Sequence, residues 1–530
     1  PELTIPSYAS MDLFWNKFYL AENLNAVEKL KEFADGITVV VGFADVDKDS
    51  IGPNKKPVLY NSLAIIQNRE IVAIQDKTLL PEYDIFYEKR YFEKGRGHQT
   101  FELKGLKFGA EICEDMWTEG YKENPTEDLL KEKVDVVINS SASPYHFRKY
   151  DVRNQIIENI VEKHEVDFIY ANVVGAYDAL YGQAVFDGRS RVLNKKGDLI
   201  ATGKGFREEL IILNLYRSKK IEAPRIAETK ELKDALILGL RQYVERHERE
   251  SKRTVNKFIV GVSGGIDSAV VLALAVEAFG KDRVLAVTMP SKYSSDETKS
   301  DAYKVAENLG VEIDTIPIVD PYNTFIATLN SDPRFKDLPE NVAEENVQAR
   351  LRMMYLMWYS NKIGGMVLGT GNKTELALNN CTVFGDMVGS ITVLGDVDKD
   401  RVYDIAELQN EEAAYDVVPE KTISRPPTAE LKGNQSDADV MGAEPRIIAP
   451  LVRAIIEEQL TVREAIDRFE NEFSREVIFN TFARIDGGEW KRRLGPQAIR
   501  VTSHAFGDGR RIPIENGLYR HEIKKMTSEN

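Results

Sequence analysis

The chain has 530 residues, of which 43% are hydrophobic and 29% charged, and its formal net charge is -15. We expect two or three domains, because a single hydrophobic core stops growing well below this length. The acidic charge argues against a general nucleic-acid or membrane binder, although a local basic patch can still hold a phosphorylated small molecule. Two cysteines, Cys113 and Cys381, give no disulfide framework and favour a reducing, cytoplasmic compartment. No apolar run in the sequence has the length that crossing a bilayer requires.

Short apolar runs alternate with helix-like stretches in the first half of the chain. The runs are rich in Val and Ile and are bounded by Gly, Asn or Asp, as strands are. We expect strands within residues 36–46, 62–74, 106–112, 134–143, 166–174 and 189–203, and a helix over 153–165. The mixture predicts a layered α/β domain over residues 1–213. A polar segment with a proline, residues 214–229, is expected to be a linker.

The second half, residues 230–530, alternates more regularly. A helix is predicted over residues 230–250. Strands are then predicted over 257–263, 283–290, 311–318 and 365–371, with helices over 267–280, 295–310 and 345–364. Apolar strands that alternate with helices predict a doubly wound, parallel sheet. Ligands bind at the carboxyl ends of such strands, where the loops "SGGIDS", "MPSKYSS" and "GTGNKTE" are expected.

The stretch "GVSGGIDS" joins a predicted strand to a predicted helix. Gly264 and Gly265 let the backbone approach an anion closely, and Ser263 and Ser268 offer hydroxyl groups. Asp267 fits a phosphate site if a cation, most simply Mg²⁺, lies between its carboxylate and the phosphate. A helix cap and tight turn without a ligand is the alternative, because a lone glycine-rich loop is weak evidence.

The same stretch resembles the pyrophosphate loop of N-type ATP pyrophosphatases, which transfer AMP from ATP to a substrate oxygen. Further stretches resemble the NAD synthetases within that class. They appear in the family's order and cover most of residues 235–515. They are "MPSKYSSDETKSDA" (289–302), "ENVQARLR" (345–352), "LGTGNKTELAL" (368–378), "FGDMVGSITVL" (384–394), "RPPTAEL" (425–431) and "WKRR…RVTSHAFGDGRRIPI" (490–514).

This resemblance implies a role for individual residues of the second half. Asp267 and Glu375 are implied to hold Mg²⁺. ATP binding is implied for Gly261, Ser263, Gly264, Gly265, Asp267, Ser268 and Thr370, and deamido-NAD binding for Asn346, Glu375 and Lys491. Lys399 is implied to neutralise charge near the bond that breaks. The alternatives are that Asn346 caps a helix and that Lys399 and Lys491 are ordinary solvated charges.

Two segments depart from the family pattern. The chain has "DVDKDRVY" at 396–403 where the family usually has "DVPKT", and "NQSDADVMGAEP" at 434–445 where it usually has "NQTDQDSLPPY". We therefore expect the loop that closes over the substrates to differ in detail, whereas the chemistry is expected to be kept.

The first half supplies a candidate nitrogen source. Cys113 follows the predicted strand "LKFGAEI", on a sharp turn, and Lys77 follows another predicted strand. With Glu2 near the start of the sequence, these residues resemble the Glu–Lys–Cys triad of nitrilase-type amidases over residues 1 to about 210. In that family Glu is the general base, Cys the nucleophile and Lys the partner of the oxyanion. For Cys113 the alternative is a buried small residue.

The nitrilase resemblance also implies a pocket for the amide donor. Tyr83, Ser143 and Lys149 fall where that family binds glutamine, and Glu88 would be a second carboxylate that steers the lysine. Cys381 has no partner pattern and is interpreted as structural. The six histidines show no metal-ligand spacing, so a zinc site is not expected.

Together the resemblances imply a glutamine-dependent NAD synthetase fold and reaction. A nitrilase-like α-β-β-α sandwich would precede a Rossmann-like sheet domain of the adenine nucleotide α-hydrolase type. The first would release ammonia from glutamine, and the second would use it to amidate deamido-NAD with ATP and Mg²⁺. An internal ammonia tunnel and a homo-oligomer are expected. The rivals are another amidotransferase ligase of the pyrophosphatase class and a catalytically silent nucleotide-binding sensor.

The start of the sequence carries one more expectation. Nitrilase-like domains begin with a central strand that leads into the catalytic glutamate, but this sequence opens on "PELT". A missing central strand leaves neighbouring backbone groups unpaired, at roughly 1–3 kcal/mol for each buried group. We therefore expect that an apolar strand precedes Pro1 in the complete protein, and that Glu2 on a free terminus is poorly positioned.

Overall fold

The computed structural model describes residues 1–336, 338–425, 431–432 and 442–528. The chain divides into two compact units, a first unit of Pro1–Ala179 with Ala184–Ile226, and a second unit of Leu180–Gln183 with Ala227–Asn530. One boundary, between Ile226 and Ala227, falls within the segment 214–229 that was expected to be a linker, whereas the assignment of Leu180–Gln183 to the second unit was not expected. None of the helices in the described ranges has the length and apolarity that crossing a bilayer requires.

The first unit contains two sheets, whose strands match the apolar runs of the sequence. One has the antiparallel order β1-β2-β3, and the other the order β11-β10-β7-β6-β5-β4, in which β5, β6 and β7 run parallel. The strands of these sheets are β1 (Thr38–Ile51), β2 (Pro57–Gln67), β3 (Glu70–Asp76), β4 (Thr100–Leu103), β5 (Leu106–Ile112), β6 (Val136–Ser141), β7 (Asp167–Asn172), β10 (Arg191–Leu193) and β11 (Leu199–Thr202). Two further strands, β8 (Val174–Asp178) and β9 (Gly182–Asp187), belong to neither sheet. The helices are α1 (Lys17–Lys31), α2 (Pro125–Leu130) and α3 (Lys149–His164).

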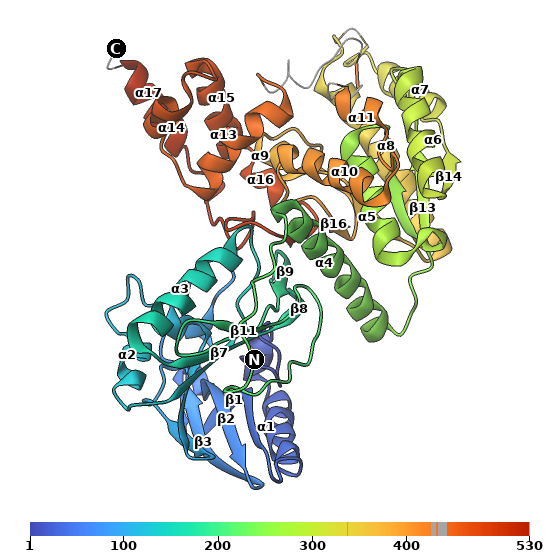
Figure 1. The fold of residues 1–530 in the computed structure, drawn as a ribbon. Helices are drawn as coiled ribbons and strands as arrows, with labels where there is room; N and C mark the ends of the chain where they lie inside the picture. Colours follow the sequence, from blue (N-terminus) through green and yellow to red (C-terminus); the bar gives the residue numbers. More distant parts are fainter. Residues whose placement is uncertain (337, 426–430, 433–441, 529–530) are drawn as a thin grey trace. The chain divides into compact units, whose positions relative to one another are not determined.

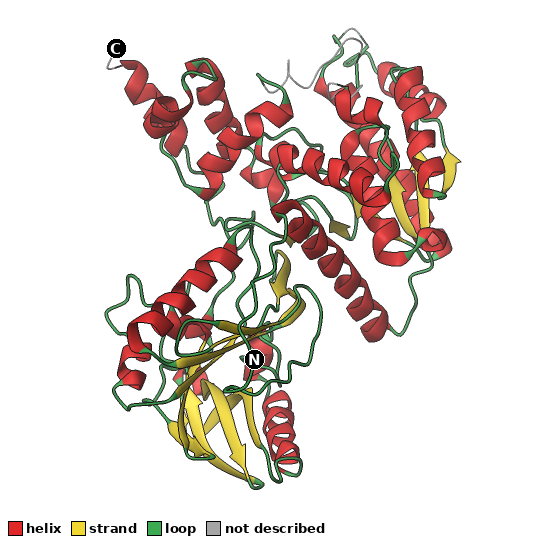
Figure 2. Cartoon of the chain, in the orientation of Figure 1, coloured by secondary structure: helices red, strands yellow, loops and turns green. Residues whose placement is uncertain are grey.

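The layers of this unit follow from the side chains of β2, which point alternately to the two faces of its sheet. Ala64 and Ile66 pack in a cluster with Val27 of α1, whereas Leu63 and Ile65 pack with residues of β5. Successive side chains of a strand point to opposite faces, so this sheet is covered by α1 on one side and by the other sheet on the other. The helices α2 and α3 pack on the far face of that second sheet. The expected α-β-β-α sandwich is therefore confirmed (Figure 2).

The second unit is built on a parallel sheet of order β14-β13-β12-β15-β16-β17. Its strands are β12 (Phe258–Gly261), β13 (Val284–Thr288), β14 (Glu312–Thr315), β15 (Met366–Gly369), β16 (Ile391–Thr392) and β17 (Ala498–Arg500). Its helices are α4 (Glu228–Ser251), α5 (Ile266–Phe279), α6 (Asp296–Leu309), α7 (Val319–Asn330), α8 (Val342–Ile363), α9 (Lys373–Ala377), α10 (Lys399–Ala413), α11 (Glu420–Ser424), α13 (Pro445–Glu457), α14 (Val462–Phe469), α15 (Arg475–Gly487), α16 (Glu489–Arg492) and α17 (Leu518–Ser528).

Both faces of this sheet are covered by helices, as a doubly wound sheet requires. Phe258 of β12 stacks on Phe279 of α5, with 3.7 Å between the ring centroids, whereas the next residue, Ile259, packs in a cluster with Leu356 of α8. The helices α5 and α8 therefore lie on opposite faces of the sheet. The expected parallel-sheet domain is confirmed, and Figure 1 traces its element order.

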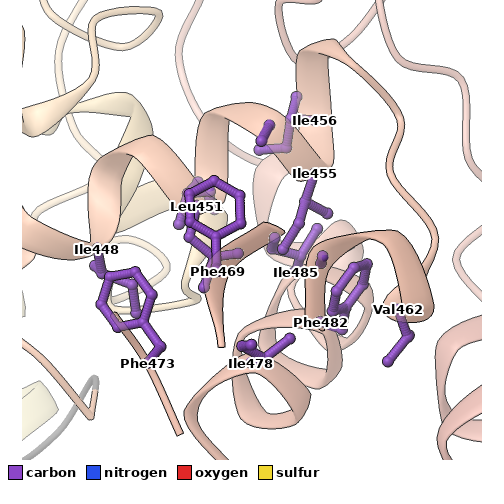
Figure 3. Close-up of a cluster of buried hydrophobic side chains, with 14 of the residues drawn as sticks. Ile448, Leu451, Ile455, Ile456, Val462, Phe469, Phe473, Ile478, Phe482 and Ile485 are labelled. Atoms are coloured by element: carbon purple, nitrogen blue, oxygen red, sulfur yellow. The ribbon is translucent and has the colours of Figure 1, made fainter. Parts of the chain in front are cut away.

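The C-terminal helices form a core of their own. Side chains of α13, α14 and α15 interlock there, among them Ile455, Phe469 and Phe482 (Figure 3). The apolar positions of α14 and α15 recur at helical spacing, which directs one face of each helix into the cluster. Ala377 and Leu378 at the end of α9 join the same cluster, so this core also fixes the helix that carries Glu375.

Candidate functional site

The first candidate site lies in the first unit, around the ammonium group of Lys77. Lys77 follows β3 and is 1% exposed. Its Nζ lies 2.7 Å from Oε1 of Glu2 and 2.6 Å from Oε1 of Glu88. Burial by itself lowers the pKa of Lys77, but the attraction of these two carboxylates outweighs it and raises the pKa well above its ordinary value. The lysine is therefore a fixed cation.

Glu2 is held by three partners. It is fully buried, and beside Lys77 it accepts hydrogen bonds from Nδ2 of Asn61 (2.7 Å) and from the backbone N–H of Ala142 (2.9 Å). The expectation that Glu2 is poorly positioned at this terminus therefore does not hold in the structure. Its second oxygen is turned toward the peptide of Ala142, beside Ser143.

Glu88 is the second carboxylate that contacts Lys77, and it has a partner that Glu2 lacks. Its Oε1 accepts a hydrogen bond of 2.6 Å from the hydroxyl of Tyr8 in addition to the contact with Lys77. Burial raises the pKa of Glu88 to about 7, although Lys77 opposes the shift. The two carboxylates around one lysine thus have different environments, which is how one site provides groups for different tasks.

Cys113 begins a short 3-10 turn, Cys113–Met116, directly after β5, as the sequence predicts. Its φ of 46° lies in the left-handed region, which is uncommon for a residue with a Cβ and marks strain at functional positions. The thiol is buried, and burial together with the charge of Glu2 raises its pKa well above the ordinary value, against the effect of Lys77. Cys113 is therefore a neutral thiol at rest, and it requires a base to become a nucleophile.

The residues predicted to bind the amide donor gather around this turn. The hydroxyl of Tyr83 lies 3.0 Å from both carboxylate oxygens of Glu114, the neighbour of Cys113, and Tyr121 donates to the same carboxylate. Ser143 follows Ala142, and its N–H donates to Oδ1 of Asn172 (2.9 Å).

Lys149 begins α3, and its Nζ lies 4.0 Å from the ring centroid of Trp117. Burial and the nearby Arg153 lower the pKa of Lys149. This lysine interacts electrostatically with both Cys113 and Glu114, which places it beside the same turn. Lys149 and Tyr83 thus both interact with Glu114, the neighbour of Cys113.

The second candidate site lies in the second unit, at the carboxyl ends of β12 and β15. The loop after β12 is closed on itself, because Ser263 Oγ accepts from Gly265 N–H (3.2 Å) and Ser268 Oγ donates to Gly265 O (2.9 Å). Gly264 has a φ of 87°, and a Cβ there would meet the carbonyl oxygen of Thr298 at 2.1 Å, so only glycine fits. No side chain in the described part of the chain caps α5, which leaves its first N–H groups for an anion.

Lys399 lies between Asp267 of this loop and Glu375. The Nζ of Lys399 contacts Asp267 Oδ2 and lies 3.5 Å from Glu375 Oε1. Lys399 is 1% exposed, so the alternative of a solvated charge is wrong. Burial lowers the pKa of Lys399, but Asp267 and then Glu375 raise it above its ordinary value. Two carboxylates thus converge on one ammonium group.

Asn372, which was not predicted, connects these groups. Its Nδ2 donates to Asp267 Oδ1 (2.8 Å), and its Oδ1 accepts from the N–H of Glu375 (3.0 Å) in a capping box that starts α9. The spacing of Asn372 and Glu375 is a helix-start signal that the sequence already contains. The N–H of Lys399 in turn donates to Oγ1 of Thr374 (3.0 Å), so α9 and α10 start at fixed positions relative to each other.

Two further predicted residues of this unit, Asn346 and Lys491, lie around one segment, residues 379–382. Asn346 accepts a hydrogen bond of 2.7 Å from Thr382 Oγ1, and Lys491 donates to the carbonyl of Cys381 (2.7 Å). Asn346 lies inside α8, whose cap is Asn341, so the alternative that Asn346 caps the helix is wrong. Thr370 lies just beyond β15 and is half-buried.

Of the two segments that depart from the family pattern, the structure describes the first in full and only the end of the second. Residues 396–403 contain the start of α10, and Asp396 accepts hydrogen bonds from the N–H groups of Val501 and Thr502, each 2.8 Å. Most of residues 434–445, and of the stretch "RPPTAEL" before them, lies outside the described residues.

Comparisons with known proteins match a different family to each of the two parts of the chain that carry these clusters. Residues 1–225 match the carbon-nitrogen hydrolase family and residues 233–495 match the NAD synthase family. These matches define a ligase that carries its own amide hydrolase. The chain is 38% identical to a glutamine-dependent NAD(+) synthetase of Acinetobacter baylyi, over 98% of this chain and 91% of the relative. It is 35% identical to one of Synechocystis, over 98% and 92%. The chain belongs to the family of glutamine-dependent NAD(+) synthetases.

Solved structures give the same result. A glutamine-dependent NAD+ synthetase of Acinetobacter baumannii, solved in complex with ADP, has a TM-score of 0.74 and 36% identity, over 98% of this chain and 91% of that one. A glutamine-dependent NAD(+) synthetase of Cytophaga hutchinsonii has a TM-score of 0.76 at 19% identity, over 99% and 93%. At that identity the second likeness concerns the fold alone.

Proposed function

We propose that the protein amidates deamido-NAD to NAD, with ATP as the driving substrate and glutamine as the nitrogen source. The observation that carries this proposal is the presence of two lysine-centred clusters in one chain. One joins Glu2, Lys77 and Glu88 beside Cys113, and the other joins Asp267, Glu375 and Lys399 at a glycine-rich loop. Family membership supports the pairing of an amide hydrolase with a ligase.

The first reaction proceeds on Cys113. Glu2 takes the proton of the thiol, and the sulfur attacks the side-chain carboxamide of glutamine, because a buried thiol with a raised pKa is a weak nucleophile until a base activates it. The ammonium of Lys77 stabilises the oxyanion that develops. The C–N bond breaks, Glu2 returns its proton to the leaving ammonia, and water then hydrolyses the γ-glutamyl thioester to glutamate.

Glu88 holds Lys77 together with Glu2, and Tyr83, Ser143 and Lys149 bind the α-amino acid end of glutamine. Tyr83 fits this role because it stands over Glu114, half exposed at the edge of the turn. Lys149 supplies a positive charge for a carboxylate.

The second reaction transfers AMP. The nicotinate carboxylate attacks the α-phosphorus of ATP, and pyrophosphate leaves into the loop of Ser263, Gly264 and Gly265. The uncapped N–H groups of α5 and the ammonium of Lys399 offset the charge of the leaving group. Ammonia then attacks the adenylated carboxyl carbon, and AMP leaves with formation of the amide. Asn346 and Lys491 position the dinucleotide near residues 379–382.

Mg²⁺ fits the carboxylates of the second site. Mg²⁺ is usually held by one or two carboxylates together with substrate phosphates. Asp267 and Glu375 converge within contact distance of one ammonium group, and the described residues contain no larger cluster of potential metal ligands. The bound ion supplies charge neutralisation on the phosphates of ATP, and these two carboxylates would hold it.

The same proposal includes a homo-oligomer in the cytoplasm, with ammonia passed internally from the first reaction to the second. Sedimentation analysis of the purified protein tests the oligomer. Formation of NAD from glutamine tests internal transfer when the medium contains glutamate dehydrogenase, 2-oxoglutarate and NADPH, which together consume free ammonia. Full inhibition of NAD formation by the trap contradicts it.

One assay tests the reaction itself. The protein is mixed with deamido-NAD, ATP, Mg²⁺ and glutamine, and NAD, AMP, pyrophosphate and glutamate are quantified in parallel. Equal amounts of NAD, AMP and pyrophosphate are expected. Pyrophosphate release with another carboxylate substrate, and none with deamido-NAD, identifies a different amidotransferase of the same class. Absence of turnover with every substrate identifies a nucleotide-binding sensor.

A further inference from the structure

A buried carboxylate with no role so far lies between the two turns that carry Lys77 and Cys113. Asp115 is 1% exposed and belongs to the 3-10 turn that begins at Cys113. Its Oδ1 accepts hydrogen bonds from the backbone N–H groups of Thr78 (3.0 Å) and Leu79 (2.8 Å). Its Oδ2 accepts one from the N–H of Ile112 (3.2 Å). One oxygen therefore binds the backbone of the two residues that follow Lys77, and the other binds the backbone of the residue that precedes Cys113.

These three peptide groups need a partner that the sheets do not supply. Thr78 and Leu79 lie beyond the end of β3, where the chain has left the sheet. Ile112 is the last residue of β5, immediately before the left-handed φ of Cys113. A buried backbone N–H without a partner is costly, so the carboxylate replaces the missing ladder partners.

The contact with Ile112 also bears on the conformation of Cys113. A strained backbone angle persists only where its surroundings determine it from several sides. The side chain of Asp115 reaches back three residues to Ile112 and so closes the turn around Cys113. The same side chain binds a second segment, 36 residues away in the sequence at Leu79, so the two turns cannot shift independently.

We propose that Asp115 is a positioning residue for glutamine hydrolysis, which fixes the distance between the Lys77 ammonium and the Cys113 thiol. The proposal rests on the glutaminase reaction proposed above. Asp115 acts through backbone groups and contacts neither the substrate nor the reacting atoms. The oxyanion forms on the carbon that Cys113 attacks, and Lys77 stabilises it only from a defined position. The rate of the chemical step therefore depends on this carboxylate, whereas glutamine binding does not.

Two variants separate these effects. Asp115→Asn keeps the size of the side chain and one oxygen acceptor, but it places an NH₂ group against one of the backbone donors. Asp115→Ala removes all three hydrogen bonds. Because a displacement of about 1 Å can lower a rate by about a hundredfold, we expect glutamine-dependent kcat to fall on the order of tenfold for Asn and a hundredfold for Ala. Ammonia-dependent NAD formation should stay at the wild-type rate in both.

The experiment uses the full chain and compares three quantities. These are the glutamine-dependent kcat, the ammonia-dependent kcat, and the Kd of glutamine measured by calorimetry in a Cys113→Ala background with and without Asp115→Asn. Asp167→Asn serves as the control, because Asp167 is also a buried carboxylate of the first unit that accepts a backbone hydrogen bond, from Lys195 N–H at 2.7 Å. Asp167→Asn should leave the ratio of the two activities unchanged.

The outcomes are distinct. A lower glutamine-dependent kcat with an unchanged ammonia-dependent kcat and an unchanged Kd supports the proposal. An unchanged ratio of the two activities overturns it, and so does a Kd that weakens by the same factor as the rate, because Asp115 would then shape the pocket instead. If the Ala variant does not fold, the Asn variant decides. A wild-type protein without glutamine-dependent activity refutes the proposed function, and this proposal with it.

Discussion

The amide nitrogen of Asn372 lies 2.8 Å from Oδ1 of Asp267 and donates a hydrogen bond to it. This contact joins two loops that are 105 residues apart in the sequence, the glycine-rich loop and the start of α9. The same Asn372 caps the helix that presents Glu375. The position of one carboxylate of the proposed Mg²⁺ site is therefore tied to the position of the other.

Asp267→Asn should lower ammonia-dependent NAD formation by on the order of a hundredfold or more, because metal and charge contacts of this kind stabilise the transition state by several kcal/mol. The amide keeps the shape of the side chain but loses the charge that faces Lys399. Glu307→Gln on the exposed face of α6 is the matched control and should have no effect. Steady-state kinetics with saturating ammonia measures both, and wild-type turnover of Asp267→Asn contradicts the assignment of this loop.

Cys113→Ala should abolish glutamine-dependent NAD formation and spare ammonia-dependent formation, because Cys113 acts only on the amide donor. Cys381→Ala is the matched control for the removal of a thiol. Burial raises the pKa of Cys381 to about 12, so it is not ionised at neutral pH, and both activities should persist without it. Loss of both activities in Cys113→Ala indicates a structural role or obligate coupling, and survival of both refutes the triad.

Lys399→Met should leave Asp267 and Glu375 facing each other without their shared cation. Removing one partner of a buried ion pair costs about 3–5 kcal/mol, so we expect a lower unfolding temperature in metal-free buffer. Added Mg²⁺ should restore much of the loss, since an ion that binds only the native state stabilises it. The wild-type protein should respond less, and Lys304→Met, on the surface of α6, should behave as wild type. Differential scanning calorimetry across a MgCl₂ series measures the effect, and equal Mg²⁺ responses of all three proteins are evidence against it.

Glu88 should give the stability of the protein a defined pH dependence. Its folded-state pKa is raised from 4.5 to about 7, so between these values the native protein binds a proton that the unfolded chain does not. The contribution of Glu88 to the free energy of unfolding is therefore fully present below about pH 4.5, and it is lost as the pH rises through 7.

Glu88→Gln cannot titrate and should lack this slope. The unfolding temperature of the wild type, relative to the variant, should fall between pH 5 and pH 7.5. Groups that do not interact with Glu88 titrate alike in both proteins and cancel in the difference. A difference that is constant over this range, or that grows with pH, shows that Glu88 does not carry the raised pKa.

The sequence was sufficient to predict the layers of the fold and to place Lys77 and Cys113 directly after strands. Their strands are marked by apolar runs, and a residue that follows a buried strand has a predictable place at the sheet edge. Asn372 could also have been predicted from the sequence, because its spacing from Glu375 is a helix-start signal. Asn61 and Tyr8 were not, because they meet Glu2 and Glu88 across 59 and 80 residues, and no local pattern encodes such pairs.

At Cys113 the residue that the reaction needs is not the residue that would make the native backbone most stable. A side chain with a Cβ is strained at a φ of 46°, whereas glycine adopts this angle freely. Cys113→Gly would therefore relieve strain in the native state while it removes the nucleophile. Selection for heat resistance alone would discard the thiol, so a thermostabilised form of this protein has to gain its stability elsewhere and keep the strained cysteine.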